Sequence, residues 1–277
     1  MSKGQITKIE SNDYTVNSND CKYICKCRGK FRQLNIVPLV GDNVVFNKED
    51  KVIEEVLPRK NEFSRPKVAN IDSAILVTSL KLPDFSTNLL DKLIVLMELK
   101  KVEPIICITK KDLLTPDEFR EIEKHLEYYQ KIGYKVVENT DIDIIKKLLK
   151  NKTTVFVGQT GAGKSTLLNR LEPNFALATG EVSKALGRGR HTTRVVEMFS
   201  LFGGKVFDTP GFSSLEFSNF SNNDIKEAFI EFKKYPCVYK DCMHTNEAEC
   251  QVKAAVTAGK ISKERYNNYL TFINRTR

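Results

Sequence analysis

No apolar run in the 277-residue sequence approaches the roughly 18–20 residues that a membrane-spanning helix needs. The N-terminal residues, MSKGQITKIESNDY, lack the apolar core of a secretion signal, so we expect a protein that is not exported. The sequence also contains no internal repeat and no low-complexity segment. We therefore predict a cytoplasmic globular protein, and its length accommodates two or three compact domains.

Seven cysteines are an odd number, and in a chain without an export signal they favour reduced thiols or metal ligands over disulfides. Lysine and arginine number 44 against 35 aspartate and glutamate residues, which gives a formal net charge of +9. A positive excess of this size favours a polyanionic partner such as nucleic acid. A lysine-rich composition without such a partner would give the same charge, so charge alone does not decide the question.

Residues 1–62 contain short β-prone runs separated by turn clusters, at residues 14–16, 21–27 and 44–46. They leave no room for strand–helix–strand units, so we predict a small OB-type β-barrel. Basic residues of one sequence parity would project from one face of an uninterrupted strand: Lys22, Lys26, Arg28, Lys30 and Arg32. That face is either an oligonucleotide-binding surface or a solvated strand face, and a turn at Gly29 would interrupt it.

From residue 63 to residue 217 the pattern changes to alternating strands and helices. Strands are predicted at residues 71–80, 104–109, 135–138, 153–157, 195–199 and 205–207. Helices are predicted at residues 89–100, 116–132, 141–150 and from about 163 onward. This alternation predicts an α/β domain with a mostly parallel sheet covered on both faces. Residues 218–277 are predicted to form a helical domain, with helices at residues 222–235, 248–258 and from the cap Ser262 to about 274.

The sequence GQTGAGKS at residues 158–165 has the G-x₄-G-K-S spacing of a phosphate-binding loop. It follows a β-run and opens a predicted helix, which is the context that this motif requires. Backbone N–H groups would surround the phosphates, Lys164 would reach the β- and γ-phosphates, and the Ser165 hydroxyl would bind Mg²⁺. The predicted nucleotide-binding residues of this loop are Gly158, Gln159, Thr160, Gly161, Ala162, Gly163, Lys164, Ser165 and Thr166.

A predicted buried strand ends in a tetrapeptide that resembles the T/N-K-x-D guanine motif of GTPases, formed by Thr109, Lys110, Lys111 and Asp112. The Asp112 carboxylate can accept hydrogen bonds from N1–H and from the exocyclic 2-amino group of guanine, and adenine offers neither donor. The Lys110 stem would pack beneath the base. We therefore expect GTP as the substrate.

Asp208-Thr-Pro-Gly211 follows another predicted strand and resembles the D-x-x-G motif of GTPases. In that motif Asp208 would hold Mg²⁺ through water, and the Gly211 amide would contact the γ-phosphate. The guanine motif precedes the phosphate-binding loop, whereas common GTPases have the opposite order. The sequence therefore predicts a circularly permuted P-loop GTPase domain, with residues 138–140 at the place of a fifth, base-backing motif.

A Cys/His cluster lies between the C-terminal predicted helices, with the spacing C-x₄-C-x-H-x₅-C: Cys237, Cys242, His244 and Cys250. Three thiolates and one imidazole fit a closed tetrahedral structural zinc site, in which no position is left for a catalytic water. Redox or disulfide chemistry is the alternative use of these thiols. The other cysteines, among them Cys107 in a buried strand, are expected to be free thiols.

Together, these features resemble the ribosome small-subunit-dependent GTPase A family of bacteria over nearly the whole chain. Further matching stretches are FSRP at 63–66, VANID at 68–72, GRGRHTT at 187–193 and DTPGF at 208–212. The resemblance implies an OB-type barrel, GTP turnover stimulated by the small ribosomal subunit and its rRNA, and a role in late subunit maturation. It also implies that Thr193 binds Mg²⁺ together with Ser165. Thr109 departs from the commoner asparagine, which leaves the base selectivity of Asp112 intact.

Phe212 stands where many GTPases have a glutamine that orients the attacking water, so we expect slow intrinsic hydrolysis. His191, beside the expected Mg²⁺ ligand, is the nearest polar candidate for that role. The predicted catalytic set is therefore His191, Lys164 and Gly211. The alternative for His191 is an RNA contact or a passive loop residue.

Two other functions compete with this one. The first is a permuted GTPase that acts on the large ribosomal subunit, and the second is an RNA-binding module whose nucleotide site is vestigial. Intact Lys164, Ser165, Asp208 and Asp112 argue against the second, and the barrel combined with the zinc element argues against the first by resemblance. A monomer is expected.

Overall fold

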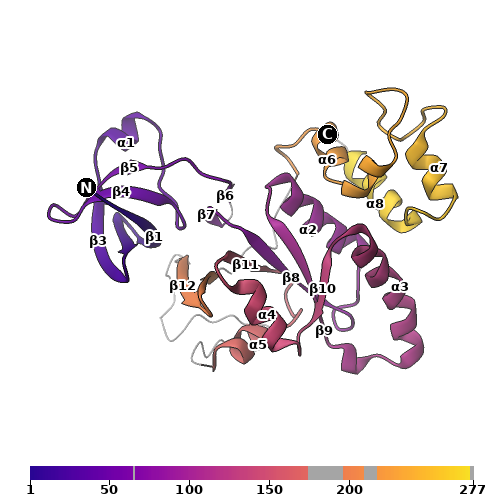
Figure 1. Ribbon diagram of the computed structural model, residues 1–277, viewed down its shortest axis with the longest axis horizontal. Helices are drawn as coiled ribbons and strands as arrows, with labels where there is room; N and C mark the ends of the chain where they lie inside the picture. The colour runs from indigo at the N-terminus through magenta and orange to yellow at the C-terminus, as the bar shows by residue number, and fades with distance from the viewer. Residues whose placement is uncertain (65, 174–195, 209–216, 275–277) are drawn as a thin grey trace. The chain divides into compact units, whose positions relative to one another are not determined.

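The computed structural model describes residues 1–64, 66–173, 196–208 and 217–274 (Figure 1). The chain forms two compact units, each built from segments that are far apart in the sequence. The first unit comprises Met1–Ile75, Thr140–Thr160 and Lys164–Ser214, and the second comprises Leu76–Asn139, Gly161–Gly163 and Leu215–Arg277. Because each unit combines several segments, the predicted domain limits at residues 62 and 217 stay a prediction.

The N-terminal part of the first unit is a closed five-stranded β-barrel. Its elements are β1 (Ser2–Glu10), β2 (Asp13–Ser18), β3 (Cys21–Cys27), α1 (Lys30–Gln33), β4 (Asn43–Asn47) and β5 (Val52–Val56). The strands follow the order β1-β2-β3-β5-β4, and β1 also pairs with β4, which closes the barrel. Ile6, Val16, Val44, Phe46 and Ile53 are completely buried inside it. The predicted OB-type barrel is confirmed.

Side chains of strand β3 alternate between the barrel interior and its surface, but the strand ends before the last of the predicted basic residues, which run from Lys22 to Arg32. Cys25 is completely buried, whereas Lys22, Ile24 and Lys26 are exposed on the other face. The strand ends at Cys27 and α1 begins at Lys30. The strand is therefore interrupted near Gly29, as the sequence allowed, and only Lys22 and Lys26 of the five basic residues lie on its exposed face.

The rest of the first unit contains most of the predicted phosphate-binding loop and the strands beside it. Its elements are β6 (Glu62–Ser64), β7 (Lys67–Ala69), α4 (Ile142–Leu149), β11 (Thr153–Val157), α5 (Lys164–Leu171), β12 (Glu197–Leu201) and β13 (Gly204–Asp208). β13 pairs in parallel with β11 and antiparallel with β12. β12 also pairs with β1, with Lys8 opposite Glu197, so the barrel adjoins this sheet within the unit.

Gly41 fixes the connection between the barrel and the β6–β7 hairpin. Its φ of +97° lies in the left-handed region, and a Cβ atom there would meet the Ala69 carbonyl oxygen at 2.1 Å. The Gly41 carbonyl accepts hydrogen bonds from the side chains of Gln5 and Asn70. Only glycine can occupy this position without displacing the backbone of Ala69.

The second unit contains the guanine-motif part of the fold and the C-terminal helices. Strand β8 (Ser73–Ser79) begins in the first unit and enters the second, where the strand order is β10-β9-β8. The other elements are α2 (Thr87–Leu99), β9 (Glu103–Thr109), η1 (Lys111–Leu113), α3 (Pro116–Ile132), β10 (Lys135–Glu138), α6 (Asn222–Glu227), η4 (Ile230–Lys234), α7 (Gln251–Thr257) and α8 (Lys263–Ile273).

Local signals set the limits of helix α3, which is confirmed at residues 116–132. Thr115 and Glu118 form a capping box at its start, Pro116 occupies the first turn, and Gly133 ends it with a φ of +117°. The predicted helix at 222–235 is wrong as one continuous element. It stops at Glu227 and resumes as the 3₁₀ helix η4, because Glu231 and Phe232 turn into the core.

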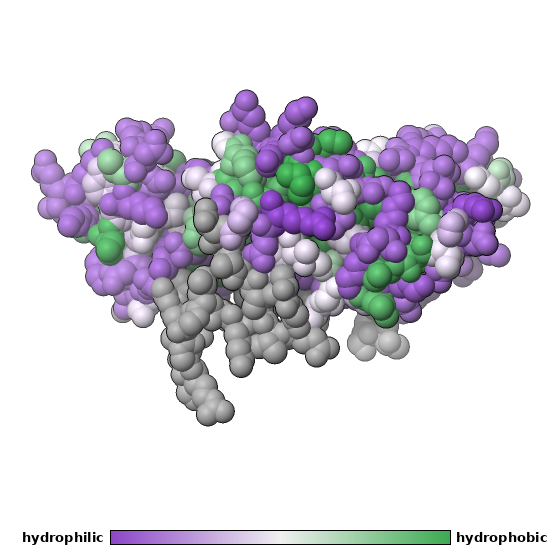
Figure 2. Space-filling model, turned by 90° about the horizontal axis from the view of Figure 1, so that it is seen from below, coloured by the Kyte–Doolittle hydropathy of each residue, from purple (hydrophilic) through white to green (hydrophobic). Residues whose placement is uncertain are grey.

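Among the described residues, no helix is both long enough and apolar enough to span a membrane. Exposed large apolar side chains include Ile24, Leu34 and Val37 near the barrel, and Val238 and Tyr239 next to the Cys/His cluster. Over the described residues, the face seen in Figure 2 is mainly hydrophilic, and apolar side chains form scattered patches.

Candidate nucleotide site and metal centre

The phosphate-binding loop connects β11 to α5, as its sequence predicts. Gly161 and Gly163 have φ angles of +79° and +97°, which L-residues with a Cβ atom adopt only with strain. Ala162 between them is completely buried. Ser165 and Thr166 lie in the first turn of α5, where backbone N–H groups have no partner inside the helix. The loop therefore has the backbone geometry that an anion site needs.

Lys164 is held at this loop by two backbone contacts. Its Nζ donates to the carbonyl oxygen of Gly158 at 2.5 Å and to that of Gln159 at 2.8 Å. Desolvation by burial lowers the pKa of Lys164 below its usual value. A phosphate group in the loop would supply the opposite charge that this half-buried ammonium lacks.

Thr109 joins the guanine motif to the phosphate-binding loop. It is 1% exposed, and its hydroxyl donates to the Ala162 carbonyl at 2.7 Å. Its own carbonyl accepts from the amide of Leu80 at 3.1 Å. The two motifs are separated by about fifty residues of sequence, and this buried hydrogen bond brings them together.

Lys110 and Asp112 follow Thr109 at the end of β9. Lys110 has a φ of +58°, and its Nζ donates to the carbonyl of Leu82. Asp112 lies in η1 with an exposed side chain, so its carboxylate is accessible to a ligand.

Lys111, the third residue of the guanine motif, contacts residues of β10 and α3. The Lys111 ammonium lies 2.6 Å from the Glu138 carboxylate and 4.4 Å from the centre of the Phe119 ring. The amide of Asn139 donates to the carbonyl of Ile108 at 2.9 Å. The predicted fifth motif at residues 138–140 is therefore adjacent to the guanine motif.

Asp208 is the last residue of β13, which runs parallel to β11 with Thr153 opposite Lys205. The carboxyl ends of parallel neighbours lie at the same edge of a sheet, so Asp208 and the phosphate-binding loop share one edge. His191, Thr193 and Gly211 lie outside the described residues. Their predicted roles are therefore expectations from the sequence.

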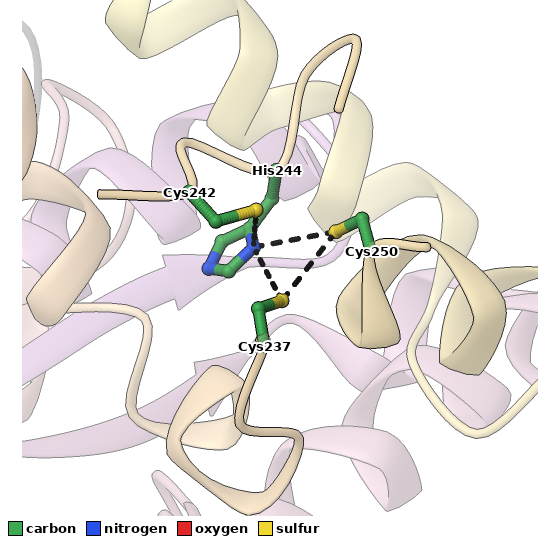
Figure 3. Close-up of side chains that lie close together, drawn as sticks. All are labelled: Cys237, Cys242, His244 and Cys250. Carbon is green, nitrogen blue, oxygen red and sulfur yellow. Dashed lines mark hydrogen bonds between the residues drawn. The ribbon is translucent and has the colours of Figure 1, made fainter. Parts of the chain in front are cut away.

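The four predicted metal ligands converge in the second unit, as Figure 3 shows. His244 Nδ1 lies 3.5 Å from the sulfur of Cys237 and 3.4 Å from those of Cys242 and Cys250. The sulfurs of Cys237 and Cys250 are 3.8 Å apart, too far for a disulfide.

These distances fit a tetrahedral zinc ion. Zn–S bonds of about 2.3 Å and Zn–N bonds of about 2.0–2.1 Å place sulfurs about 3.8 Å apart, and sulfur and nitrogen about 3.6 Å apart. Burial, with a smaller contribution from Lys226, lowers the pKa of His244 and so favours the neutral imidazole that a metal requires. The chemistry and the spacing of the donor set both suit one closed zinc site.

Neighbouring side chains fix the backbone that presents these ligands. The hydroxyl of Tyr266 donates to the His244 carbonyl at 2.6 Å, and that of Tyr269 donates to the Met243 carbonyl at 2.5 Å. The Glu247 carboxylate accepts from the amides of Met243 at 2.8 Å and Thr245 at 2.6 Å. The loop is therefore held mainly by helix α8 and by its own acidic residue.

Sequence reasoning missed two features of the second unit. The first is the segment Leu80–Pro83, which contacts Lys110 and whose Pro83 Cδ would lie 3.6 Å from a Cβ at Gly161. The second is the buried ion pair between Asp91 and Arg265. Asp91 carries a detectable signal, because it is an acidic residue between Leu90 and the apolar run LIVLM, with Lys92 the one other charge in the segment LLDKLIVLM.

Comparisons with known proteins agree with this geometry. A profile of the RsgA GTPase family matches residues 56–218, and a profile of the RsgA N-terminal domain matches residues 3–52. Small ribosomal subunit biogenesis GTPase RsgA 2 of Oceanobacillus iheyensis is 45% identical over 283 residues, covering 99% of this chain and 97% of the relative. Small ribosomal subunit biogenesis GTPase RsgA of Enterococcus faecalis is 44% identical over 279 residues, covering 98% and 94%.

Two solved structures are also similar over their full lengths. YjeQ from Thermotoga maritima has a TM-score of 0.85 and 35% identity, with 99% of each chain covered. YloQ, described as a circularly permuted GTPase, has a TM-score of 0.83 and 37% identity, covering 100% of this chain and 97% of that one. The circular permutation predicted from the motif order is confirmed.

Proposed function

Because the chain belongs to the RsgA GTPase family and is a GTP-hydrolysing enzyme, we propose that it binds the small ribosomal subunit, which stimulates its hydrolysis during late maturation. The observation that carries this proposal is the similarity over 98–99% of the chain to relatives named for small-subunit biogenesis. The net charge of +9 suits an rRNA partner. The site of action is the cytoplasm, and the chain acts as a monomer.

The guanine site is formed by residues 109–112 and the phosphate site by residues 158–166. Asp112 accepts from guanine, and the Lys110 stem packs beneath the base. The loop amides and Lys164 bind the phosphates, and the contacts of Lys164 with Gly158 and Gln159 hold its ammonium over the loop beforehand. This arrangement provides binding and charge stabilisation without a covalent step.

Mg²⁺ supplies the Lewis acid when GTP is bound, and the residues that would hold it are Ser165, Thr193 and, through water, Asp208. Ser165 lies in the first turn of α5 and Asp208 ends the strand parallel to β11, so these two come from one sheet edge. His191 orients the attacking water, and the Gly211 amide contacts the γ-phosphate.

The Cys237–Cys242–His244–Cys250 cluster holds one structural Zn²⁺. The support is the fit between the observed distances and tetrahedral coordination by three sulfurs and one nitrogen. All four positions of the metal are taken by the protein, so the ion stabilises residues 237–250 and takes no part in hydrolysis.

The barrel is the rRNA-binding part of the chain. The exposed face of β3 carries Lys22 and Lys26 on either side of Ile24, which is 64% exposed. Cations around an exposed apolar side chain combine phosphate contacts with contact to a base or sugar, as in other oligonucleotide-binding barrels.

A binding experiment with purified subunits tests the proposal. The chain, loaded with a non-hydrolysable GTP analogue, is sedimented with isolated small or large ribosomal subunits. We expect co-sedimentation with the small subunit and a large increase in its GTP turnover. Preferential binding to the large subunit, or turnover that neither subunit changes, would contradict the proposal.

A further inference from the structure

Arg265 of α8 is a buried cation that fixes the C-terminal helices to helix α2. It is 1% exposed, and its guanidinium lies 2.5 Å from the carboxylate of Asp91 and 2.5 Å from that of Glu231. Three aromatic rings flank it, with Phe229 at 4.8 Å and Tyr129 and Tyr134 at 5.7 Å. Buried charges are costly unless they are fully paired, so this cluster specifies one geometry for the contact of α2 with α8.

A second set of contacts extends this joint to the first turn of α2. Asn268 lies one helical turn after Arg265 and donates to Asp91 at 2.7 Å. Its side-chain oxygen accepts from Asn88 at 3.0 Å. The two helices are therefore connected at Asn88 and again at Asp91, which restricts sliding and rotation of one against the other.

The neighbouring face of α8 holds the Cys/His cluster. Tyr266 and Tyr269 donate to the backbone carbonyls of His244 and Met243. Phe232, next to Glu231 in η4, packs edge-on against the His244 ring at 5.3 Å. The residues that hold α2 therefore alternate along α8 and η4 with the residues that hold the cluster.

The chain that leads into α2 contacts the guanine motif and the phosphate-binding loop. The Leu80 amide donates to Thr109, the Leu82 carbonyl accepts from Lys110, and Pro83 lies against Gly161. Helix α2 begins four residues later, at Thr87, after its cap Ser86. Residues 80–91 thus contact the guanine motif and the phosphate-binding loop at their start and helix α8 at their end.

We propose that Arg265 is a positioning residue that couples the Cys/His cluster to guanine-nucleotide binding through α8, α2 and residues 80–83. Loss of the metal frees residues 237–250, and Tyr266 and Tyr269 then lose the ordered carbonyls to which they donate. The α2–α8 contact loosens, and residues 80–83 no longer hold Lys110 and Gly161 in place.

Coupling of this kind is reciprocal: if the metal strengthens nucleotide binding, the nucleotide must strengthen metal binding by the same factor. This inference takes residues 109–112 and 158–166 as the nucleotide site and the cluster as the zinc site of the proposed function. It does not depend on any contact with the ribosome.

Zinc transfer from the full chain to a chromogenic chelator, with and without saturating GDP, tests the coupling. We expect GDP to raise the zinc affinity, measured from the fraction of zinc transferred at equilibrium, by roughly five-fold or more, the lower end of typical coupling between sites. In Arg265→Met the ratio of zinc affinities with and without GDP should fall to near unity, although the variant still binds GDP. Arg120→Met, which removes an exposed arginine from α3, is the matched control and should behave as the wild type.

Arg265→Met leaves two buried carboxylates unpaired, so Asn268→Ala is the second variant. It removes the contacts to Asn88 and Asp91 without burying an unpaired charge, and it should reduce the effect of GDP on zinc affinity in part. Equal zinc release with and without GDP in the wild type would overturn the proposal. Undiminished retention of zinc by GDP in both variants would also overturn it. GDP would then retain zinc by stabilising the whole chain against unfolding and not through the contact of α2 with α8. If GDP strengthens zinc retention but neither ribosomal subunit binds the chain, the proposed function is contradicted and the coupling is not.

Discussion

The Thr109 hydroxyl donates to the Ala162 carbonyl at 2.7 Å, and this bond joins the TKKD tetrapeptide to the GQTGAGKS loop. In Thr109→Val the shape is kept but the buried carbonyl loses its donor. We expect the free energy of unfolding to fall by about 1–3 kcal/mol and GDP binding to weaken. Urea denaturation and fluorescent GDP titration measure both effects. Thr109→Ser retains the hydroxyl and is the control; a valine variant that binds GDP as tightly as the serine variant would contradict this role.

Asp112→Asn should change which purine nucleotide is preferred. The amide cannot accept from both guanine donors, but it can donate to the C2 carbonyl of xanthine. We expect the preference for GTP over XTP to fall by roughly 10²-fold or more, since sites built around substrate hydrogen bonds discriminate strongly. Competition binding measures the ratio, with Asp117→Asn on the exposed start of α3 as the control. Unchanged discrimination would show that base selectivity resides elsewhere.

Purification without chelators should yield one zinc per chain, as measured by elemental analysis. Binding of Zn²⁺ to such ligand sets supplies on the order of 10 kcal/mol, part of which becomes folding free energy. Cys242→Ala should therefore lose the metal and expose residues 237–250 to proteolysis. Cys21→Ala, at an exposed thiol of the barrel, should keep it. Protein without metal and with Cys237 and Cys242 oxidised would refute the assignment.

His191→Ala should lower the subunit-stimulated rate while leaving GTP affinity nearly unchanged. A positioned side chain that orients or deprotonates the attacking water typically contributes about 10²–10⁴-fold. Single-turnover hydrolysis on the small subunit isolates this step from product release. If the variant hydrolyses GTP at the wild-type rate there, the histidine is an RNA contact or a passive loop residue.

Neutralising Lys22 and Lys26 together, as Lys22→Gln and Lys26→Gln, should weaken binding to the small subunit without affecting GDP binding. Each lost phosphate contact lowers the salt dependence of binding by about one unit of slope. Lys124→Gln with Lys131→Gln, on the charged helix α3, is the matched control pair. An unchanged salt slope in the barrel variant would indicate that β3 faces away from the RNA.

Local rules predicted much of the fold from the sequence. The capping box of Thr115 and Glu118 fixed the start of α3, and the G-x₄-G-K-S spacing located the loop between β11 and α5. Non-local contacts account for the errors. The helix expected over residues 222–235 is interrupted because Glu231 pairs with Arg265, thirty-four residues further along the chain. Helical periodicity carries no information about such a pairing.

The site was predictable to a similar extent. Cys237, Cys242, His244 and Cys250 were identified by spacing alone, because zinc ligation imposes a recognisable pattern of residue types. Leu82 was not, because it contributes a backbone carbonyl to Lys110, and a backbone contact leaves no trace in residue type.

The Asp91–Arg265 pair also determines when helices α2 and α8 can pack together during synthesis of the chain. The two residues are separated by 174 positions, which a ribosome adding about 5–20 residues per second covers in roughly 9–35 seconds. The barrel strands, complete by Val56, can close early in that interval. Asp91 of helix α2 can accept from Tyr129 once α3 has been made, but it must wait for its cationic partner until α8 emerges. A newly made chain would therefore complete the contact between α2 and α8 only after Arg265 has left the ribosome.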